Sequence, residues 1–367
     1  MDPDGFALRP HPSPVPAARR DELMATPVFG RVFTDHMVTI AWNVERGWYD
    51  PAVVPYAPLS IDPAAAVLHH GATIFEGLKV FRGPDGAVSA FRPDLNAARF
   101  RTSARRLAMP ELPDATFLAA LRALLRVDHP WVPPAGGEGA LYVRPLLVAT
   151  TPSLRPEPAP DHLFVLLAGP VGPYFPGGAA PVRAWLSRDQ VRAFPGGTGA
   201  AKCGANYAAS LAGQARAAAH GCDQVVWLDA THRRWVEEMG VMNLFFVFDD
   251  GRGGHEVVTP ELNGSFLAGV TRSSLLTLAA ESGAAVSERP IAADEWRERA
   301  VDGSLREVFA SGTAAVVTPV GTVVDERGEF PIADAAPGPL TLALRETLTG
   351  IQRGARPDPH RWLAPLR

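Results

Sequence analysis

The sequence predicts a two-domain α/β protein, in which a small N-terminal α+β domain precedes a larger α/β domain. The first reason is length, because 367 residues exceed what a single hydrophobic core usually organises. The second is composition, because residues 169–178 hold four glycines and three prolines, which is typical of a linker. The third is the alternation of strand and helix patterns after this segment. We therefore expect domains over 1–172 and 182–367, joined by a linker over 173–181.

Local patterns predict a hairpin, two helices and two longer strands in the N-terminal half. The hairpin turn is Gly83–Pro84–Asp85–Gly86, a run of turn-forming residues between two apolar segments. A proline followed by an aspartate is typical of the first turn of a helix. In order, the expected elements are strands over 78–81 and 88–91, a helix from Pro93 to about Leu107, a helix over 116–127, and strands over 139–150 and 161–169.

In the C-terminal half, apolar runs predict strands, and alanine-rich or amphipathic segments predict helices. The expected elements are, in order, a helix over 206–219 stopped by Gly221, a strand over 224–229, a strand over 241–248, a helix over 271–281, and a strand over 306–311 that ends in a glycine turn. This alternation is the pattern of an α/β domain.

Composition argues against several classes of protein. The formal net charge is −4, and there is no long run of like charge that would suggest a nucleic-acid surface. No apolar stretch approaches the roughly 20 residues that span a bilayer, and the proline-rich N-terminus lacks the apolar region of a secretory signal. The two cysteines, Cys203 and Cys222, form neither a CxxC motif nor a local zinc site. We therefore expect a cytoplasmic protein without a bound metal.

Lysine is almost absent from the chain, and this draws attention to the two lysines that remain. Of the 35 basic residues, only Lys79 and Lys202 are lysine, and the others are arginine. A GC-rich genome accounts for the general bias. Arginine is always protonated, however, whereas a lysine amine can lose its proton and attack a carbonyl. The two lysines are therefore either chance survivors or residues with a chemical role.

Lys202 lies in the glycine-rich segment 196–207, which leads into an expected helix. A phosphate-binding P-loop requires Ser or Thr after the lysine, and Cys203 stands there, so that interpretation is disfavoured. A lysine just before a helix N-terminus lies near partial positive charge, which favours the neutral, nucleophilic amine. Tyr207 lies about one helical turn further on and is placed to hydrogen-bond whatever the lysine holds.

Glu237 and Glu238 are neighbouring acidic residues in the otherwise apolar segment 235–244. Successive side chains of a strand point to opposite faces, so we expect only one of the two glutamates to face inward. A buried carboxylate needs a partner. A protonated pyridinium nitrogen is one such partner, and a surface arginine is the commoner one.

Two segments are candidate anion-binding sites. Residues 269–273 open a helix, and free backbone N–H groups at a helix N-terminus suit a phosphate. A plain Thr or Ser N-cap is the commoner explanation of such a sequence. Gly312–Thr313–Ala314 follows a strand and offers a second, smaller cradle. Arg99, in the expected helix after Asp94, is placed to supply positive charge.

Tyr142 and Arg144 are two residues apart on the expected strand over 139–150, so they lie on one face of it. Leu141 and Val143 take the opposite, apolar face. An inward Tyr/Arg pair suits a substrate that carries a carboxylate, whereas an outward pair is an ordinary solvated face.

In their order along the chain, these segments resemble the fold-type IV pyridoxal-5′-phosphate (PLP) enzymes, which share the D-amino-acid-aminotransferase-like fold. Within that class they resemble the branched-chain aminotransferases, from about Phe29 to Val324. The segments that carry the resemblance are Phe29–Gly–Arg–Val–Phe–Thr–Asp–His–Met37, Ile74–Phe–Glu–Gly–Leu–Lys79, Phe91–Arg–Pro–Asp–Leu–Asn96, Tyr142–Val–Arg–Pro145, Pro170–Val–Gly–Pro–Tyr–Phe175, Gly196–Gly–Thr–Gly199 with Lys202, Glu238–Met–Gly240 and Ser311–Gly–Thr–Ala314.

The resemblance implies a homodimer that transfers the amino group of leucine, isoleucine or valine to 2-oxoglutarate with PLP as cofactor. It implies that Lys202 forms a Schiff base with PLP and later moves the α-proton. Glu238 would meet the pyridinium nitrogen, which keeps the ring an electron sink, and Tyr207 the ring hydroxyl. The residues implied at the phosphate are Arg99, Val270, Thr271 and Thr313. Those implied around the substrate are Phe29, Phe75, Tyr142, Arg144, Tyr174, Val241 and Ala314, with His70 and Leu154 reaching it from the second subunit.

Three positions depart from the family's pattern. His70 stands where the family usually has Tyr, Val241 where Gly or Thr is common, and Ala268 where Pro is usual. The first two keep open a specialised aminotransferase of the same family that makes an unusual amino acid. A fold-type IV PLP lyase and a PLP-binding protein without turnover also stay open at this point. The presence of both Lys202 and Glu238 disfavours the binding protein.

Overall fold

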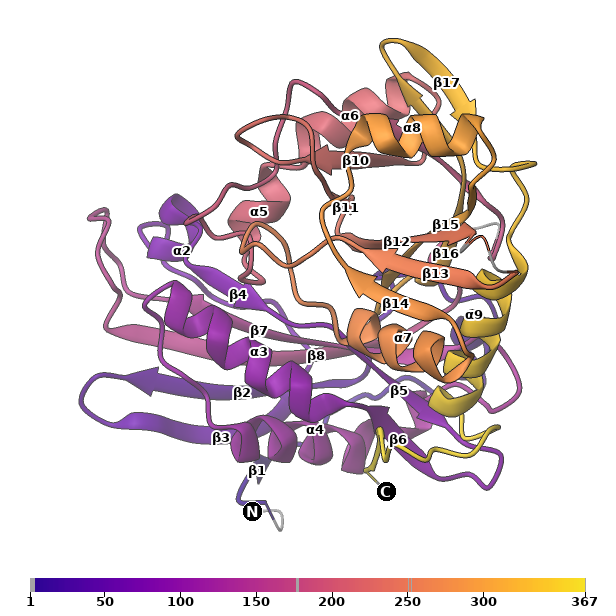
Figure 1. Ribbon diagram of the computed structural model, residues 1–367. Coiled ribbons are helices and arrows are strands. Elements are labelled where there is room, and N and C mark those ends of the chain that lie inside the picture. The colour runs from indigo at the N-terminus through magenta and orange to yellow at the C-terminus, as the bar shows by residue number, and fades with distance from the viewer. Residues whose placement is uncertain (1–3, 176–177, 250, 252, 367) are drawn as a thin grey trace. The chain divides into compact units, whose positions relative to one another are not determined.

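The computed structural model describes residues 4–175, 178–249, 251 and 253–366, and the chain divides into two compact units (Figure 1). Unit 1 runs to Tyr174 and also includes Ala201–Gly204 and the chain from Gly350 onward. Unit 2 comprises Phe175–Ala200 and Ala205–Thr349. Each unit has its own sheet and its own hydrophobic core.

This division differs from the predicted one at two places. The short piece Ala201–Gly204, which contains Lys202, groups with unit 1 rather than with the C-terminal domain. The end of the chain does so as well, because β18 (Leu363–Pro365) pairs antiparallel with β6 (Val88–Phe91). Strands so far apart in sequence leave no local pattern that predicts their pairing. Residues 176–177 of the expected linker lie outside the described residues.

Unit 1 is built on a largely antiparallel sheet with the strand order β1-β3-β2-β8-β7-β5-β6-β18, to which β4 is added beside β7. Two of its helices, α3 and α4, pack on each other, and α4 packs on β2 (Figure 1). The rings of Phe100, Phe117 and Phe164 meet in the core. The remaining elements are β1 (Ala7–Leu8), α1 (Ala17–Ala25), β2 (His36–Asn43), β3 (Gly47–Pro55), α2 (Ala66–His70), β4 (Thr73–Phe75), β5 (Leu78–Arg82), α3 (Pro93–Arg106), α4 (Asp114–Asp128), the 3-10 turn His129–Trp131, β7 (Ala140–Ala149) and β8 (Asp161–Val171).

The local predictions for this half are confirmed. The predicted hairpin is β5–β6, and its turn is closed by a hydrogen bond from the Gly83 N–H to the Ala87 carbonyl (2.8 Å). Helix α3 has Pro93 in its first turn and Asp94 beside it, as the sequence indicates for a helix start. Strands β7 and β8 and helix α4 also lie where they were expected, whereas the hairpin β2–β3 was not predicted.

Unit 2 holds a mixed sheet with the strand order β11-β10-β9-β16-β15-β12-β13-β14, and β17 adds to β16. Strand β11 also pairs with β12, so the strands β11, β10, β9, β16, β15 and β12 form a closed ring. In Figure 1 these strands run in orange and rose tones, with α8 near β17. The elements are β9 (Val182–Leu186), α5 (Gly204–Ala208), α6 (Leu211–Ala219), β10 (Gln224–Leu228), β11 (Val236–Met239), β12 (Met242–Asp249), β13 (His255–Thr259), α7 (Val270–Glu281), β14 (Ala285–Glu288), α8 (Ala293–Val301), β15 (Leu305–Gly312), β16 (Val316–Asp325), β17 (Gly328–Pro331) and α9 (Pro339–Gln352).

The continuous helix expected over 206–219 is wrong, because the chain forms two helices, α5 and α6, with a turn between them. Ser210 lies at this break. Its hydroxyl donates to the carbonyl of Tyr207 (2.7 Å), and its N–H bonds the same carbonyl (3.1 Å). A serine that bonds nearby backbone competes with the helical ladder, which accounts for the interruption. The other predicted elements of this half, β10, β12, α7 and β15, are present.

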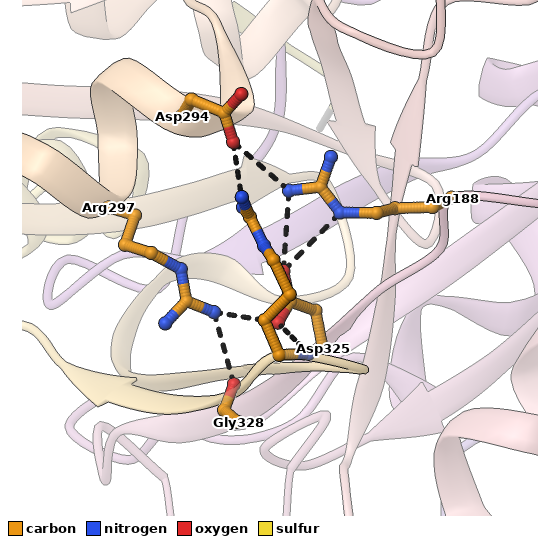
Figure 2. A network of polar contacts seen from close by, with 6 residues as sticks. Arg188, Asp294, Arg297, Asp325 and Gly328 are labelled. Carbon is orange, nitrogen blue, oxygen red and sulfur yellow. Dashed lines mark hydrogen bonds and ion pairs between the residues drawn. The ribbon is translucent and has the colours of Figure 1, made fainter.

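Charged residues join α8 to the β16–β17 hairpin (Figure 2). Asp325, the last residue of β16, has a fully buried side chain. Nη2 of Arg297, from α8, lies 2.6 Å from its Oδ1, while Nη2 of Arg188 and Nε of Arg327 lie 3.3 and 3.5 Å from its Oδ2. Arg188 and Arg327 also reach Asp294 in the first turn of α8, at 3.3 and 2.7 Å. Three arginines thus share two aspartates, of which only Asp325 is buried.

Within the described part of the chain, the helices are too short or too polar for any of them to cross a membrane.

Candidate active site

Lys202 is held by its backbone against β4 in unit 1. Its N–H donates to Oγ of Ser103 (2.9 Å), and its carbonyl accepts a hydrogen bond from the N–H of Phe75 (2.9 Å). The next residue, Cys203, forms a β-bridge with Ile74. Nζ of Lys202 lies 5.0 Å from the centroid of the Phe75 ring. The chain therefore fixes the lysine backbone and leaves the amine beside an aromatic face.

Arg99, on α3, makes a bidentate ion pair with Glu76, a residue that the sequence analysis did not single out. Nε lies 2.6 Å from Oε1 and Nη2 lies 2.9 Å from Oε2, and the Glu76 side chain is fully buried. Asn96 donates a further hydrogen bond to Oε2 (2.8 Å). Burial would raise the pKa of Glu76, but the charge and hydrogen bonds of Arg99, with a contribution from the charge of Lys202, hold that pKa below its ordinary value. The ion pair fixes the Arg99 guanidinium in place, with its charge balanced by Glu76.

Aromatic residues predicted at the substrate gather on the same unit. The ring of Phe29 lies edge-on to the rings of Tyr142 and Tyr174, with centroids 4.9 and 5.4 Å apart. Arg144 donates a hydrogen bond to the Tyr142 hydroxyl (3.1 Å), and its guanidinium lies 4.7 Å from the Phe75 ring centroid. Aromatic walls with one arginine suit a ligand that has an apolar body and a carboxylate.

The alternation predicted for β7 is confirmed. Leu141 and Val143 are fully buried in the core, whereas Tyr142 and Arg144 are half-buried on the other face. Gly77 makes room for the tyrosine, because a Cβ at 77 would collide with its hydroxyl. A glycine is therefore needed where the backbone approaches Tyr142.

The two residues expected to serve a second subunit are both accessible in unit 1. His70 is the last residue of α2 and is exposed. Leu154 lies in the connection between β7 and β8 and is 68% exposed. An exposed leucine and an exposed imidazole are free to contact another chain, which is compatible with the role expected of them.

In unit 2, one row of paired residues crosses three strands. Glu238 on β11 is opposite Asn243 on β12, and Asn243 is opposite Ser311 on β15. Directly opposed residues share a face of the sheet, so these three polar groups lie on one face. The Asn243 amide donates to the carbonyl of Leu267 (2.9 Å), which holds the loop before α7 against this row. Asn243 was not singled out from the sequence.

The start of α7 has the features of an anion site. Gly269 is its N-cap residue and lacks a side chain, and no side-chain group caps the helix among the described residues. Val270 and Thr271 are nevertheless 7% and 5% exposed, so the first N–H groups are buried. A Cβ at 269 would collide with the Asn243 amide. A buried helix N-terminus without a side-chain cap suits a phosphate, and the N-cap by Thr or Ser that the sequence left open is not formed.

The remaining cofactor and substrate candidates of unit 2 lie in turns and at helix starts. Thr313 and Ala314 lie in the turn between β15 and β16, directly after Gly312. Val241 lies in the tight turn between β11 and β12 and is 42% exposed. Tyr207 lies in α5 and is half-buried. Thr313 and Ala314 follow a strand as expected, whereas Val241, which was expected to begin a strand, lies in the turn before it.

The expectation that only one of the paired glutamates faces inward is wrong. Glu237 and Glu238 are each 3% exposed. Their side chains still alternate along the strand, but every residue of β11 is buried, so both faces are covered. The partner of Glu238 is a buried arginine, Arg192, whose Nε lies 2.5 Å from Oε1. Arg192 was not predicted, because it lies in an irregular segment without a motif.

Across the described ranges, no three His, Cys, Asp or Glu side chains come together in a group that could hold a metal ion.

Comparison with known proteins assigns the class. Residues 73–323 match the model of the amino-transferase class IV family. This match covers more than half of the chain, and the chain therefore belongs to the class IV aminotransferases, which are PLP enzymes of fold-type IV.

Within the class, the similar proteins are branched-chain-amino-acid aminotransferases. The one from Mycolicibacterium smegmatis is 56% identical over 361 residues, which is 98% of each chain. The crystal structure of the Escherichia coli branched-chain amino acid aminotransferase has a TM-score of 0.74 at 26% identity and covers 91% of this chain and 99% of its own. The T.th. branched-chain amino acid aminotransferase complexed with N-(5'-phosphopyridoxyl)-L-glutamate has a TM-score of 0.71 at 27% identity, covering 89% and 98%. The resemblance inferred from the motifs is confirmed.

Proposed function

We propose that this chain catalyses the transamination of leucine, isoleucine and valine with 2-oxoglutarate, giving branched 2-oxo acids and glutamate. This proposal rests mainly on the 56% identity with a branched-chain-amino-acid aminotransferase over nearly the full chain. The aromatic group of unit 1 supports the same substrate class, since Phe29, Tyr142 and Tyr174 pack together beside one arginine. Apolar walls take the branched side chain, and the guanidinium of Arg144 takes a carboxylate.

For PLP, we propose a role for each residue that the sequence indicates. PLP supplies an electron-poor ring that stabilises charge at the substrate α-carbon. Lys202 would hold the cofactor covalently through its amine, and the same amine would move the α-proton of the substrate. Glu238 accepts the N–H of the ring nitrogen, and Tyr207 hydrogen-bonds the ring hydroxyl. The phosphate is held by Arg99, the N–H groups of Val270 and Thr271, and Thr313.

We propose that the substrate is bordered by seven residues of one chain and two of a second copy. The seven are Phe29, Phe75, Tyr142, Arg144, Tyr174, Val241 and Ala314. The two from the partner are His70 and Leu154, whose exposure in the single chain leaves them available for such contacts. The enzyme is accordingly a homodimer, and the low cysteine content favours the cytoplasm as its compartment.

Steady-state kinetics on purified enzyme test this function. Leucine and 2-oxoglutarate should show ping-pong kinetics, because the first substrate leaves its nitrogen on the enzyme before the second collects it. A panel of amino donors then separates the branched-chain enzyme from a specialised relative, which would prefer a different donor. A lyase needs a leaving group that leucine lacks, so neither a lyase nor a binding protein would turn leucine and 2-oxoglutarate into glutamate and a branched 2-oxo acid.

Glu238→Gln is expected to keep the fold and some PLP but to lose transamination by about 10²-fold or more, the scale of one charged group at a reacting centre. A neutral amide cannot hold the ring nitrogen protonated, so the ring is a weaker electron sink. The measurement is kcat with leucine, beside the PLP content of the purified protein. Glu237→Gln is the matched control, since it changes the neighbouring glutamate and should retain most activity. If Glu237→Gln is the crippling change, the proposed ring partner is the wrong glutamate.

The two departures from the family pattern are expected to set donor preference. An apolar pocket discriminates by shape at only ~1–3 kcal/mol per methylene, so one altered side chain can reorder its preferences. His70→Tyr should shift the donor profile toward the usual branched-chain pattern, and Val241→Gly should widen the range of side chains accepted. Relative kcat/KM values over the donor panel measure both effects. Identical profiles for the wild type and both variants would show that His70 and Val241 have no part in specificity.

A further inference from the structure

Arg192 is a buried arginine of unit 2 that is fixed from two sides. Its Nε lies 2.5 Å from Oε1 of Glu238, and its Nη2 donates a hydrogen bond to the carbonyl of Ser265 (2.7 Å). The side chains of the arginine and the glutamate are only 6% and 4% exposed. Gly199 packs against the same carbonyl, because a Cβ at 199 would collide with it. The guanidinium therefore has little freedom to leave Glu238.

Glu237 belongs to the same buried cluster. It is 3% exposed and accepts a hydrogen bond from the side-chain amide of Asn263 (3.1 Å). Burial raises the pKa of Glu237, although the side-chain hydrogen bonds of Asn263 and Ser265 and the charge of Arg192 act in the opposite direction. The carboxylate of Asp229, which follows β10, adds to the rise.

In the chain without its cofactor, the charges of this cluster do not balance if both glutamates are ionised. One guanidinium compensates one buried carboxylate, and a second buried charge without a partner is costly. Glu238 has the direct ion pair, whereas Glu237 is hydrogen-bonded to a neutral amide. We propose that Arg192 is a positioning residue that holds Glu238 ionised while Glu237 stays protonated, so that the Glu237–Arg192–Glu238 trio carries no net charge.

The consequence rests on the proposed role of Glu238 at the ring nitrogen of PLP. A carboxylate that is already paired with a buried arginine stays ionised over the working pH range. Glu238 therefore accepts the N–H of the ring nitrogen and does not give up a proton to it. Arg192 touches Glu238 and not the reacting atoms, and it acts by fixing the charge and the orientation of that carboxylate.

Absorbance titration of the holoenzyme tests this role without measuring activity. The protonation midpoint of the Lys202-bound cofactor would be compared in the wild type, Arg192→Gln and Arg192→Lys. We expect Arg192→Gln to raise the midpoint by about 1 pH unit, because it removes positive charge and lets Glu238 take the proton of the ring. Arg192→Lys keeps the positive charge, so its midpoint should lie close to that of the wild type. A loss of PLP or of stability in Arg192→Gln with an unchanged midpoint would mean a merely structural arginine and would overturn the proposal.

Glu237→Gln is the matched control in the same titration. A protonated carboxyl and an amide are both neutral, so the midpoint should move by no more than a few tenths of a pH unit. A fall of about 1 unit would mean that an ionised Glu237 had been removed, which contradicts the assigned protonation state.

Urea unfolding of the cofactor-free full chain gives a second, independent test. A raised pKa in the folded state means that the stability contributed by Glu237 is present below pH 4.5 and is lost as pH rises through the raised pKa. The stability difference between wild type and Glu237→Gln should therefore shrink as pH rises above 4.5. If this stability difference does not change with pH, Glu237 is not protonated in the folded chain, and the proposal is wrong. If the purified wild-type protein shows no absorbance band of the cofactor, the proposed function is wrong. The unfolding experiment does not need the cofactor, so it would still test the protonation state of Glu237.

Discussion

Replacing Lys202 with arginine is expected to reduce transamination by about 10⁴-fold or more, the upper end of what a general acid–base group contributes. Arginine keeps the positive charge but cannot form a Schiff base or accept the α-proton, because it is protonated at all working pH values. The backbone contacts of position 202 to Ser103 and Phe75 involve only the N–H and the carbonyl, so they survive the change. Activity with leucine and 2-oxoglutarate is the measurement.

The chain offers an unusually clean control, because Lys79 is its only other lysine. Lys79→Arg keeps the charge at a buried position of β5 and should retain most activity. Borohydride reduction should also trap the cofactor, abolish its absorbance band and add its mass to the peptide that contains Lys202. Cofactor mass on the Lys79 peptide, or on neither, would remove the central residue of the proposed mechanism.

The elements that the sequence predicts correctly are those with strong local signals. The hairpin β5–β6 has a turn of Gly, Pro and Asp, helix α3 has Pro93 and Asp94 at its start, and β7 alternates buried and half-buried residues. Failures occur where a single side-chain hydrogen bond or a long-range strand pairing decides. The helix break at Ser210 depends on one side-chain hydrogen bond, and the addition of β18 to β6 joins the end of the chain to a strand that is far away in the sequence.

The residues of the candidate site likewise divide into those with a local signal in the sequence and those without one. Lys202 stands out because lysine is rare, and Tyr142 with Arg144 because strand residues two apart share a face. Glu76, Arg192 and Asn243 were missed, since each acquires its role only through a partner distant in sequence. Glu76 differs from a surface glutamate by its burial and its bidentate pair with Arg99, neither of which has a sequence pattern.

Asp325→Asn is expected to destabilise the protein by about 3 kcal/mol, the lower end of the cost of breaking a buried charge cluster. The fully buried carboxylate is shared by the guanidinium groups of Arg188, Arg297 and Arg327, and the amide leaves those charges without their buried counter-charge. We take the lower end because the three arginine side chains are 23% to 48% exposed, so water screens part of the repulsion. The free energy of unfolding in urea at pH 7 measures the loss.

Asp294→Asn is the matched control for this experiment. Asp294 contacts Arg188 and Arg327 as Asp325 does, but its side chain is 59% exposed. Ion pairs of exposed carboxylates contribute about 0–1 kcal/mol, so the control should lose less than about 1 kcal/mol. Both variants should keep the urea m-value of the wild type, since neither changes the surface that unfolding exposes. Equal losses in the two variants would mean that burial of Asp325 does not determine the stability of the network, and that the arginines redistribute freely between the two aspartates.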